Sequence, residues 1–465
     1  MFANLGALHR GGDDEHRLRV VPCLSDRGES VQVGKHRGTL HDTPDVADTL
    51  RPYTLFSRNV STIEEFHDSL EEAYTRWATD RPRPVYLGVP LDVLASEVGD
   101  LPQLRASAPP KPREPAPSEL EAVTQQLVAA ESPAIIAGGG CRNYGGLLKH
   151  LAELLDAPVL PTANSKGLLE EDHPLNLDLS IPFAGTRTLL QEADAVLAIG
   201  TELSDVEYIF TGADPVTLRN LIRVDLDPNV SHADQIQPVI RSDAGMFIEA
   251  LLPLIGDAAD GVRRRSGATR VTEAKRDWAG VRQADPYREW FEALHRGLPE
   301  NAIVAADSAQ LAYQAHQFMP LPAGTTWMSP YGFGTLGPAL PMAVGAAVSA
   351  PERPVIALAG DGSSLFTIAE LATAADLGRQ LTLVIWVNDG YKEIEASFKR
   401  AAIPPVGVGT SAANFSAIAR GLGAHVLIAL DPSEFERAIR EAMDISRVTV
   451  IVVEAPGSLR VGAES

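Results

Sequence analysis

Gly360-Asp361-Gly362-Ser363-Ser364 directly follows one apolar stretch, Val355 to Ala359, and Asn388-Asp389-Gly390 directly follows another, Leu381 to Val387. Both stretches predict buried strands, and the residues from Thr367 to Leu377 predict a helix between them. In a strand–helix–strand unit of this kind the strands are parallel, and their carboxyl ends meet at one edge of the sheet, where open α/β sheets bind ligands. The two motifs therefore predict an α/β sheet with a ligand site at its carboxyl edge.

The residue types in these motifs suit a cation and phosphate groups. Asp361 and the amide oxygen of Asn388 are hard oxygen ligands, which Mg²⁺ prefers, and magnesium commonly shares its ligand shell with phosphates and water. Glycines let the backbone approach a phosphate closely, and N–H groups at a helix start favour an anion. GDG and NDG are also common turn sequences, which is the better interpretation of either motif alone. Each motif follows a buried strand, and they lie 27 positions apart (388 minus 361), so together they favour a site.

The composition narrows the class of protein. The chain has 465 residues, 45% of them hydrophobic and 22% charged, which suits a globular protein of about three domains. Its formal net charge of -21 repels phosphate backbones and anionic lipids, so we expect no nucleic acid and no membrane as partners. Cys23 and Cys141 are too few for a disulfide framework or a four-thiolate metal site. These features predict a cytoplasmic protein.

The chain divides into three parts separated by two connecting segments. Residues 1–94 form a first part, and the six prolines between 100 and 117 predict an extended linker. Residues 118–256 and 286–457 alternate helical and strand patterns, which predicts parallel sheets flanked by helices. Residues 257–284 are rich in charge and Gly and indicate a second linker or a surface helix. The fold class is therefore α/β, with two complete domains and a partial third.

Individual elements are predicted from their periodicity. In the first part, a helix begins after Ser61 or Thr62 and continues to Trp77, and a strand covers Val85–Val89. The remaining predicted strands are Ala134–Ala137, Pro158–Leu160, Ala195–Ile199, Leu221–Asp225, Ala302–Ala305 and Val448–Val453.

With its GDG, a helix and strand of this length, and then an Asn, the sequence resembles the thiamine-diphosphate-dependent 2-oxo acid decarboxylase and acetolactate synthase superfamily. The glycine-rich stretch from 332 to 341 looks like that family's segment beneath the cofactor, and residues 134 to 227 carry motifs similar to its central domain in the same order. The resemblance covers roughly residues 35 to 457. It implies a thiamine-diphosphate-binding fold, with 1–94 as a truncated pyrimidine-binding domain, 118–256 as a central Rossmann-like domain and 286–457 as the diphosphate-binding domain.

The resemblance also implies the cofactors and their binding residues. The cofactors are thiamine diphosphate and Mg²⁺, and the metal ligands are Asp361, Asn388 and the carbonyl of Gly390. The carbonyl of Gly334 contacts the aminopyrimidine, and Leu336 is the bulky residue that holds the cofactor bent, although plain core packing is the better interpretation of Leu336 by itself. The other implied cofactor contacts are Gly360, Gly362, Ser363, Ser364 and Tyr391.

Three stretches indicate one branch of this family. Residues 36–42, 390–394 and 403–408 look most like 5-guanidino-2-oxopentanoate decarboxylases, which act on the keto acid derived from arginine. Pyruvate decarboxylases carry a working Glu where this chain has Ile394, which disfavours that branch. Glu393 and Glu395 can bind a guanidinium group through bidentate hydrogen bonds. A solvated helix start is an equally good interpretation of these two acids.

The resemblance leaves the catalytic residue unassigned. In this family a Glu of the pyrimidine-binding domain hydrogen-bonds the aminopyrimidine and promotes its tautomer change, and residues 1–34 do not resemble the segment that carries it. Glu15 and Glu29 lie in polar, aperiodic sequence, so neither is assigned this role. The family's site is shared between subunits, so we expect a homodimer or homotetramer with a small 2-oxo acid as substrate.

Four functions stay open at this point. The first is a thiamine-diphosphate- and magnesium-dependent 2-oxo acid decarboxylase, and the second is an acetolactate-synthase-like carboligase. A catalytically silent truncated homologue is the third, and a nicotinamide oxidoreductase that uses Asp225 or Asp227 on a nucleotide ribose is a distant fourth. His36 and His41 do not have a spacing typical of zinc, so surface or interface histidines are the simpler interpretation.

Overall fold

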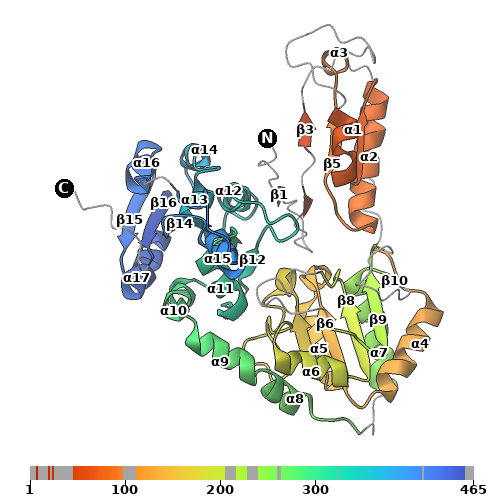
Figure 1. Ribbon diagram of the computed structural model, residues 1–465. Helices are drawn as coiled ribbons and strands as arrows, with labels where there is room; N and C mark the ends of the chain where they lie inside the picture. The colour runs from red at the N-terminus through yellow and green to blue at the C-terminus, as the bar shows by residue number, and fades with distance from the viewer. Residues whose placement is uncertain are drawn as a thin grey trace.

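The computed structural model describes residues 46–97, 112–204, 216–227, 239–258, 263–322, 324–410 and 413–455, together with short strands at 7–8, 19–20 and 23–25. Figure 1 shows a first, a central and a third part, each with its own sheet. Every strand pairing within these three sheets is parallel. The α/β class with parallel sheets is confirmed. In this described portion of the chain, no helix is long and apolar enough to cross a membrane.

The third part contains a six-stranded sheet in the order β12-β11-β13-β14-β16-β15. Its strands are β11 (Ile303–Ala306), β12 (Thr326–Met328), β13 (Val355–Gly360), β14 (Leu381–Val387), β15 (His425–Ala429) and β16 (Val448–Glu454). Its helices are α10 (Arg288–Gly297), α11 (Gln310–Phe318), α12 (Ala339–Ser349), α13 (Asp361–Ser364), α14 (Glu370–Leu377), α15 (Lys392–Arg400), α16 (Phe415–Gly421) and α17 (Pro432–Met443).

Helices cover both faces of this sheet, which explains its continuous apolar strands. On β14, Val384 and Trp386 pack with residues of α10, α11 and α17, whereas Leu383 and Ile385 pack with residues of α12, α14 and α16. Successive side chains of a strand point to opposite faces, so a strand buried on both faces needs apolar residues at every position. Each fully buried Val, Leu or Ile side chain stabilises the fold by roughly 1.5–3 kcal/mol.

The central part contains a five-stranded sheet in the order β10-β9-β8-β6-β7. Its strands are β6 (Pro133–Ala137), β7 (Val159–Pro161), β8 (Ala195–Ile199), β9 (Leu221–Asp225) and β10 (Val239–Arg241). Its helices are α4 (Pro117–Ala129), α5 (Gly145–Leu155), α6 (Ala184–Glu192) and α7 (Ala244–Ala258), with short 3-10 turns η2 (Gly139–Cys141) and η3 (Ala163–Ser165).

The first part contains a three-stranded sheet with β5 (Val85–Gly88) between β3 (Cys23–Ser25) and β4 (Phe56–Asn59). Helix α2 (Ile63–Thr79) packs on this sheet and buries Ala73 and Trp77 against Val85 and Leu87. The remaining elements are the antiparallel pair β1 (Ala7–Leu8) and β2 (Arg19–Val20), helices α1 (Val46–Leu50) and α3 (Leu91–Leu94), and the 3-10 turn η1 (Arg51–Tyr53).

Most predicted elements are present, with shifts at their ends. The predicted helix at 61–77 is α2, and Thr62 is its N-cap because its side chain accepts a hydrogen bond from the Glu65 N–H at 3.1 Å. The predicted helix at 367–377 is shorter: a turn follows α13, and α14 begins at Glu370. Strands β4, β10, β12 and β15 were not predicted, and each has five residues or fewer.

Of the two interpretations of residues 257–284, a second linker or a surface helix, the structure favours the helical one, because most of this segment folds as two packed helices. Helix α8 (Gly267–Ala274) buries Val271, and α9 (Arg276–Ala284) buries Trp278. Figure 1 shows α8 and α9 running from beside the central sheet toward the third part. The predicted linker at 100–117 lies mostly outside the described residues, and α4 already begins at Pro117.

Candidate functional site

The third sheet has a topological switch point between β11 and β13. The chain passes from β11 to β12 on one side of it and then to β13 on the other side. Helices therefore leave the carboxyl ends of β11 and β13 toward opposite faces, and ligands of open α/β sheets bind in the resulting crevice. Asp307 follows β11, Asp361 follows β13 and Asn388 follows β14, so all three lie at this edge.

Asp361 is buried and is held by three donors. Its Oδ1 accepts the Gly362 N–H at 2.7 Å, and its Oδ2 accepts the Gly390 N–H at 3.1 Å and the Thr410 hydroxyl at 3.2 Å. Burial raises the pKa of Asp361, and these hydrogen bonds act in the opposite direction. The two motifs that the sequence sets 27 positions apart are thus joined directly through this carboxylate.

The amide oxygen of Asn388 lies beside the Asp361 carboxylate and the Gly390 main-chain carbonyl. Its Nδ2 donates to Gln310 Oε1 at 2.9 Å, so its Oδ1 faces the Gly390 carbonyl oxygen at 2.8 Å and Asp361 Oδ1 at 3.2 Å. Rotating the amide would place a donor between these oxygens but would set the Asn388 oxygen against Gln310 Oε1. Gln310 Oε1 also accepts the Tyr287 hydroxyl at 3.0 Å, which supports its role as an acceptor here. Three acceptors therefore converge.

The converging oxygens fit a hard divalent cation. A carboxylate, an amide and a main-chain carbonyl are the ligand types that magnesium takes in proteins, and a cation removes the mutual repulsion of three acceptors. No group of three or more His, Cys, Asp or Glu side chains elsewhere in the described residues is arranged to hold a metal. The predicted metal ligands Asp361, Asn388 and Gly390 are thus brought together, with only one formal charge among them.

The predicted diphosphate contacts surround this point. Ser363 Oγ accepts the Gly360 N–H at 3.0 Å, which closes the turn at the end of β13. The Ser364 hydroxyl is buried and has no hydrogen-bond partner in the described structure. A ligand oxygen bound at this point would supply the missing partner. Gly362 packs against the Tyr391 ring, and a Cβ there would lie 2.6 Å from Tyr391 Cε1.

The glycine-rich segment at 332–341 lies beside the switch point, where Gly337 contacts Asp307 at the end of β11. Gly334 has φ +61°, which glycine adopts without strain, and Leu336 is partly buried. Gly337 donates its N–H to Asp307 Oδ2 at 2.8 Å and accepts the Thr367 hydroxyl at 2.6 Å. Two aromatic side chains next in line to this buried contact are strongly exposed, Phe333 with 78% and Phe366 with 63% of their surface accessible.

Sequence reasoning missed Asp307 and Gln310. Asp307 is 3% exposed and lies at the carboxyl end of β11, beside Gly337. Burial raises its pKa to about 6, against hydrogen bonds from Ser308, Gly337, Ser363 and Ala339. The signal was available, because an acid directly after a predicted buried strand is the same pattern that identified Asp361.

The central sheet has the same kind of switch point, between β6 and β8, but backbone packing closes it. A Cβ on Gly138 would lie 2.1 Å from the carbonyl oxygen of Gly200, and Gly140 packs on the same residue. Asp225 accepts the Asp227 N–H at 2.9 Å, and Asp227 pairs with Arg83 at 3.3 Å. These contacts support the structural interpretation of the three glycines over a dinucleotide site.

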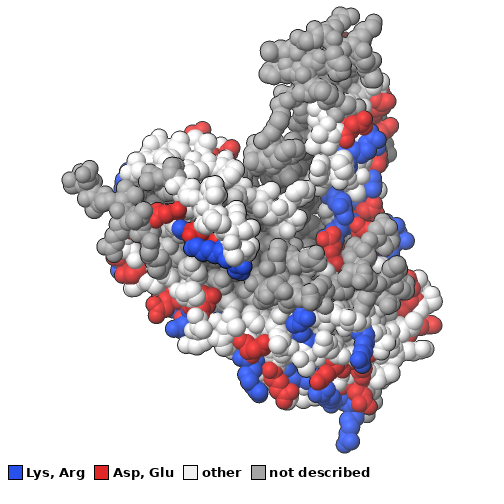
Figure 2. Space-filling model, in the orientation of Figure 1, with Lys and Arg blue, Asp and Glu red and all other residues white. Residues whose placement is uncertain are grey.

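The structure also bears on the prediction that Glu393 and Glu395 form either a guanidinium site or a solvated helix start. Glu395 pairs with Lys392 at 2.9 Å and Lys399 at 2.6 Å, which lowers its pKa to about 2, and Glu393 pairs with Arg400 at 3.0 Å. Figure 2 shows acidic and basic side chains close together on the surface in the region of α15. The pairing favours the solvated helix start over a guanidinium site. Glu15, Glu29, His36 and His41 lie outside the described residues.

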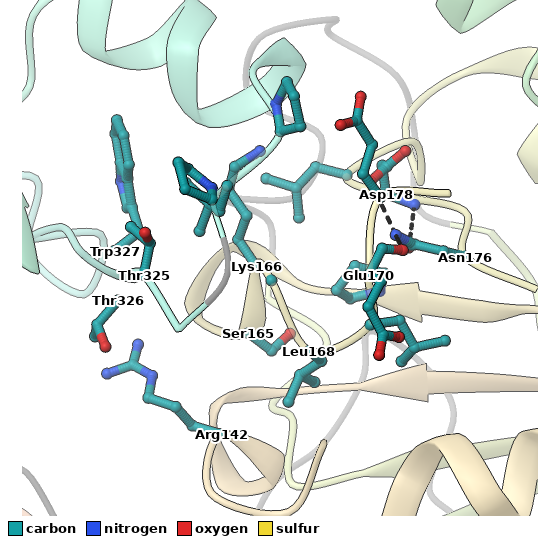
Figure 3. Close-up of a pocket in the computed structure, with 18 of the residues that line it drawn as sticks. Arg142, Ser165, Lys166, Leu168, Glu170, Asn176, Asp178, Thr325, Thr326 and Trp327 are labelled. Atoms are coloured by element: carbon teal, nitrogen blue, oxygen red, sulfur yellow. Dashed lines mark hydrogen bonds between the residues drawn. The ribbon is translucent and has the colours of Figure 1, made fainter. Parts of the chain in front are cut away.

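A cavity of about 400 Å³ lies at a different place, between the central and third parts (Figure 3). Arg142, Lys166 and Asp178 line it from the central part, and Thr325 and Trp327 from the third part. Trp327 stacks on His316 with ring centroids 5.3 Å apart, and the Tyr331 hydroxyl lies 2.5 Å from His316 Nδ1. The predicted cofactor residues do not line this cavity.

Comparison with known proteins identifies the family. The family model for the thiamine pyrophosphate enzyme C-terminal TPP-binding domain matches residues 307–453, and the model for the central domain of these enzymes matches residues 120–251. The first match begins at Asp307, directly after β11, and includes the converging oxygens of Asp361, Asn388 and Gly390. The chain belongs to the thiamine pyrophosphate enzyme family.

Relatives among characterised sequences agree with this assignment. The chain is 35% identical over 443 residues to the "Probable 2-ketoarginine decarboxylase AruI" of Pseudomonas aeruginosa, an alignment that covers 93% of this chain and 78% of that protein. It is 27% identical to acetolactate synthase isozyme 1 large subunit of Escherichia coli K12, covering 80% and 66%. It is 24% identical to glyoxylate carboligase of Escherichia coli O157:H7, covering 96% and 80%.

Proposed function

We propose that the protein is a thiamine-diphosphate- and magnesium-dependent decarboxylase of a 2-oxo acid, with 5-guanidino-2-oxopentanoate as its substrate. The observation that carries the proposal is the convergence of Asp361, Asn388 and the Gly390 carbonyl at the switch point. The similarity to a probable 2-ketoarginine decarboxylase supports the substrate. The motifs at 36–42 and 390–394 support the same branch.

The residues of the chain would hold and orient the cofactor. When bound, thiamine diphosphate supplies the electron sink that accepts the electron pair left by the departing CO₂. Asp361, Asn388 and the Gly390 carbonyl would hold a magnesium ion, and the ion would share the diphosphate oxygens with Ser363 and Ser364. The Gly334 carbonyl and Leu336 would orient the organic part of the cofactor. No described residue is assigned as the carboxylate that activates it.

We also propose that the working form is at least a homodimer. The segments next to the site expose large apolar side chains: Phe333 in the glycine-rich segment, Phe366 after α13, and Val406, which is 79% exposed, after α15. Apolar side chains that gather at the surface of a protein are typical of an interface. Sedimentation of the holoenzyme tests this proposal, and a monomer at micromolar concentration would contradict it.

The function is tested by turnover and by cofactor activation together. Release of CO₂ from 5-guanidino-2-oxopentanoate, dependent on both thiamine diphosphate and magnesium, would support the proposal. Acetolactate formed from pyruvate would instead identify a carboligase, which the similarity to acetolactate synthase keeps as a second candidate. Exchange of the thiazolium C2 proton into deuterated water distinguishes a silent homologue, because a bound cofactor that exchanges no faster than the free one would not support catalysis.

A further inference from the structure

Asp307 connects the two segments that are proposed to hold opposite ends of the cofactor. Its Oδ2 accepts the Gly337 N–H at 2.8 Å, one residue after Leu336 in the glycine-rich segment. Asp307 is itself fixed to β13, the strand that leads into the diphosphate motif, because its N–H donates to the Leu358 carbonyl at 2.8 Å, and Ser363 of that motif lies close enough to lower the pKa of the carboxylate. A single buried side chain therefore fixes the distance between the segment beneath the organic ring and the turn beneath the phosphates.

The surroundings of Asp307 require an acceptor with more than one lone pair. Its Oδ1 accepts the Ser308 N–H at 2.8 Å, and the Ala339 N–H at the start of α12 adds a further hydrogen bond. All of these partners are donors, so an ionised carboxylate satisfies them and a side-chain amide would turn its NH₂ group toward one of them. Asp307 is 3% exposed, so water cannot take the place of the acceptor that a mismatched donor pair would lack there.

Keeping this position ionised has a cost for the stability of the fold. Burial raises the pKa of Asp307 to about 6, so holding it ionised at neutral pH works against folding. Asp243, in the central part, gives the contrast: it is also buried, and the N–H groups that it accepts, from Gly245 at 2.9 Å and Met246 at 3.2 Å, lie only two and three positions further along the chain. Asp307 spans two segments that are 30 and 56 positions away (337 minus 307 and 363 minus 307).

We infer that Asp307 is a positioning residue for the reaction: its carboxylate sets the Gly334–Gly337 segment against Ser363, so that Leu336 and the Gly334 carbonyl face a cofactor bound through Asp361. This inference rests on the proposed function. It adds a residue outside both motifs whose charge state controls the shape of the site. Tyr313 lies on α11, the helix that follows Asp307 in the chain. Burial raises the pKa of Tyr313, and the charge of Asp307 adds to this effect.

The test compares Asp307→Asn with the matched control Asp243→Asn in the full chain loaded with thiamine diphosphate and magnesium. In Asp307→Asn we expect the rate of C2-proton exchange and kcat to fall at least about tenfold, with a smaller change in the cofactor dissociation constant, because the phosphate end is still held. In the wild type we expect the rate to fall as the pH drops below about 6, where Asp307 is protonated. This acid limb of the pH–rate profile should be absent in Asp307→Asn. Asp243→Asn should keep both the rate and the profile, and Asp307→Glu should recover part of the rate.

A second readout needs no cofactor. Hydrogen–deuterium exchange of peptides that cover residues 329–341 should increase in Asp307→Asn and stay at the wild-type level in Asp243→Asn. If the hydrogen–deuterium exchange of these peptides and the pH–rate profile are the same in Asp307→Asn as in the wild type, the positioning role is wrong. If the wild type binds no thiamine diphosphate, the proposed function is wrong, and the exchange of the 329–341 peptides still decides whether Asp307 holds this segment.

Discussion

The central and third sheets have the same order of their first four strands and differ in what occupies the switch point. In the central sheet, the loops after β6 and β8 meet backbone to backbone through Gly138, Gly140 and Gly200. In the third sheet, the loops after β11 and β13 carry Asp307 and Asp361, and the backbone stays apart. The topology brings two loops together in both cases, and only the side chains decide whether the crevice becomes packed protein or a polar site.

The loops at the carboxyl edge of the central sheet also bind protein groups. Asp80 pairs with Arg241 at 2.7 Å, Arg83 pairs with Asp227 at 3.3 Å, and Arg81 pairs with Glu202. Residues 80–83 of the first part therefore neutralise the charged side chains at the carboxyl edge of the central sheet. At the same edge of the third sheet, the charged side chains are proposed to face a ligand instead. The comparison predicts that changes at the central switch point affect stability and that changes at the third affect cofactor binding.

The largest effect is expected from Asp361→Ala. This substitution removes the one formal charge among the converging oxygens, so we expect affinity for thiamine diphosphate with magnesium to fall by more than about a hundredfold, since even changes to outer partners of metal ligands reach that size. Calorimetric titration of each variant measures the change. The control is Asp225→Asn, a buried carboxylate after a strand of the central sheet, which should bind cofactor like the wild type. Equal affinities in both variants would remove the distinction between the two sheets.

Gly138→Ala should destabilise the fold by about 3 kcal/mol, the upper end of ordinary overpacking. The added Cβ would lie 2.1 Å from the Gly200 carbonyl oxygen and 2.5 Å from Thr201 Cβ, so the backbone itself must move. Gly360→Ala is the matched substitution in the third sheet, where the nearest atom is Ala309 Cβ at 3.4 Å, and it should leave the free energy of unfolding nearly unchanged. Urea denaturation of the two variants checks this, and a larger loss in Gly360→Ala would reverse the comparison.

The pH dependence of stability should reveal the buried acid at the third switch point. The pKa of Asp307 is raised from 3.8 to about 6 in the folded protein, so the folded state binds this proton more tightly than the unfolded state. Stability should therefore rise as the pH falls from 6 toward 4, by on the order of 2 kcal/mol relative to Asp307→Asn. Unfolding of the cofactor-free protein across this range, in wild type and variant, measures the difference. Parallel curves would mean that this carboxyl is not buried as described.

The smallest effect is expected at the covered edge of the central sheet. Arg241→Gln removes the ion pair with Asp80 and a hydrogen bond to the Leu226 carbonyl at 3.1 Å. Because both charged side chains are partly exposed, the loss should be at most about 1 kcal/mol and should shrink further in high salt. Thermal unfolding at two ionic strengths tests this, and a loss of cofactor affinity in this variant would show that the central edge takes part in the site.

The sequence alone was sufficient for the class of fold and for the edge of the sheet at which the candidate site lies. Strands buried on both faces appear in the sequence as continuous apolar runs, and a polar motif directly after such a run marks the carboxyl edge of a parallel sheet. Asp361 and Asn388 were singled out in this way, whereas the Gly390 carbonyl was implied by the family resemblance. Short strands such as β10 and β12, with three residues each, were missed because three residues carry no readable period.

Only the tertiary structure decided which polar and glycine residues face a ligand. The three glycines at 138–140 and the glycines at 360 and 362 are alike as sequence, but Gly138 packs on Gly200 whereas Gly360 has space beside it. Asp225 and Asp307 both follow buried strands, but the order of the strands places only Asp307 beside the glycine-rich segment. Patterns formed by neighbours in the chain can be read from the sequence, whereas the partners of Gly138 and Asp307 are set by the order of the strands and by segments far away in the chain.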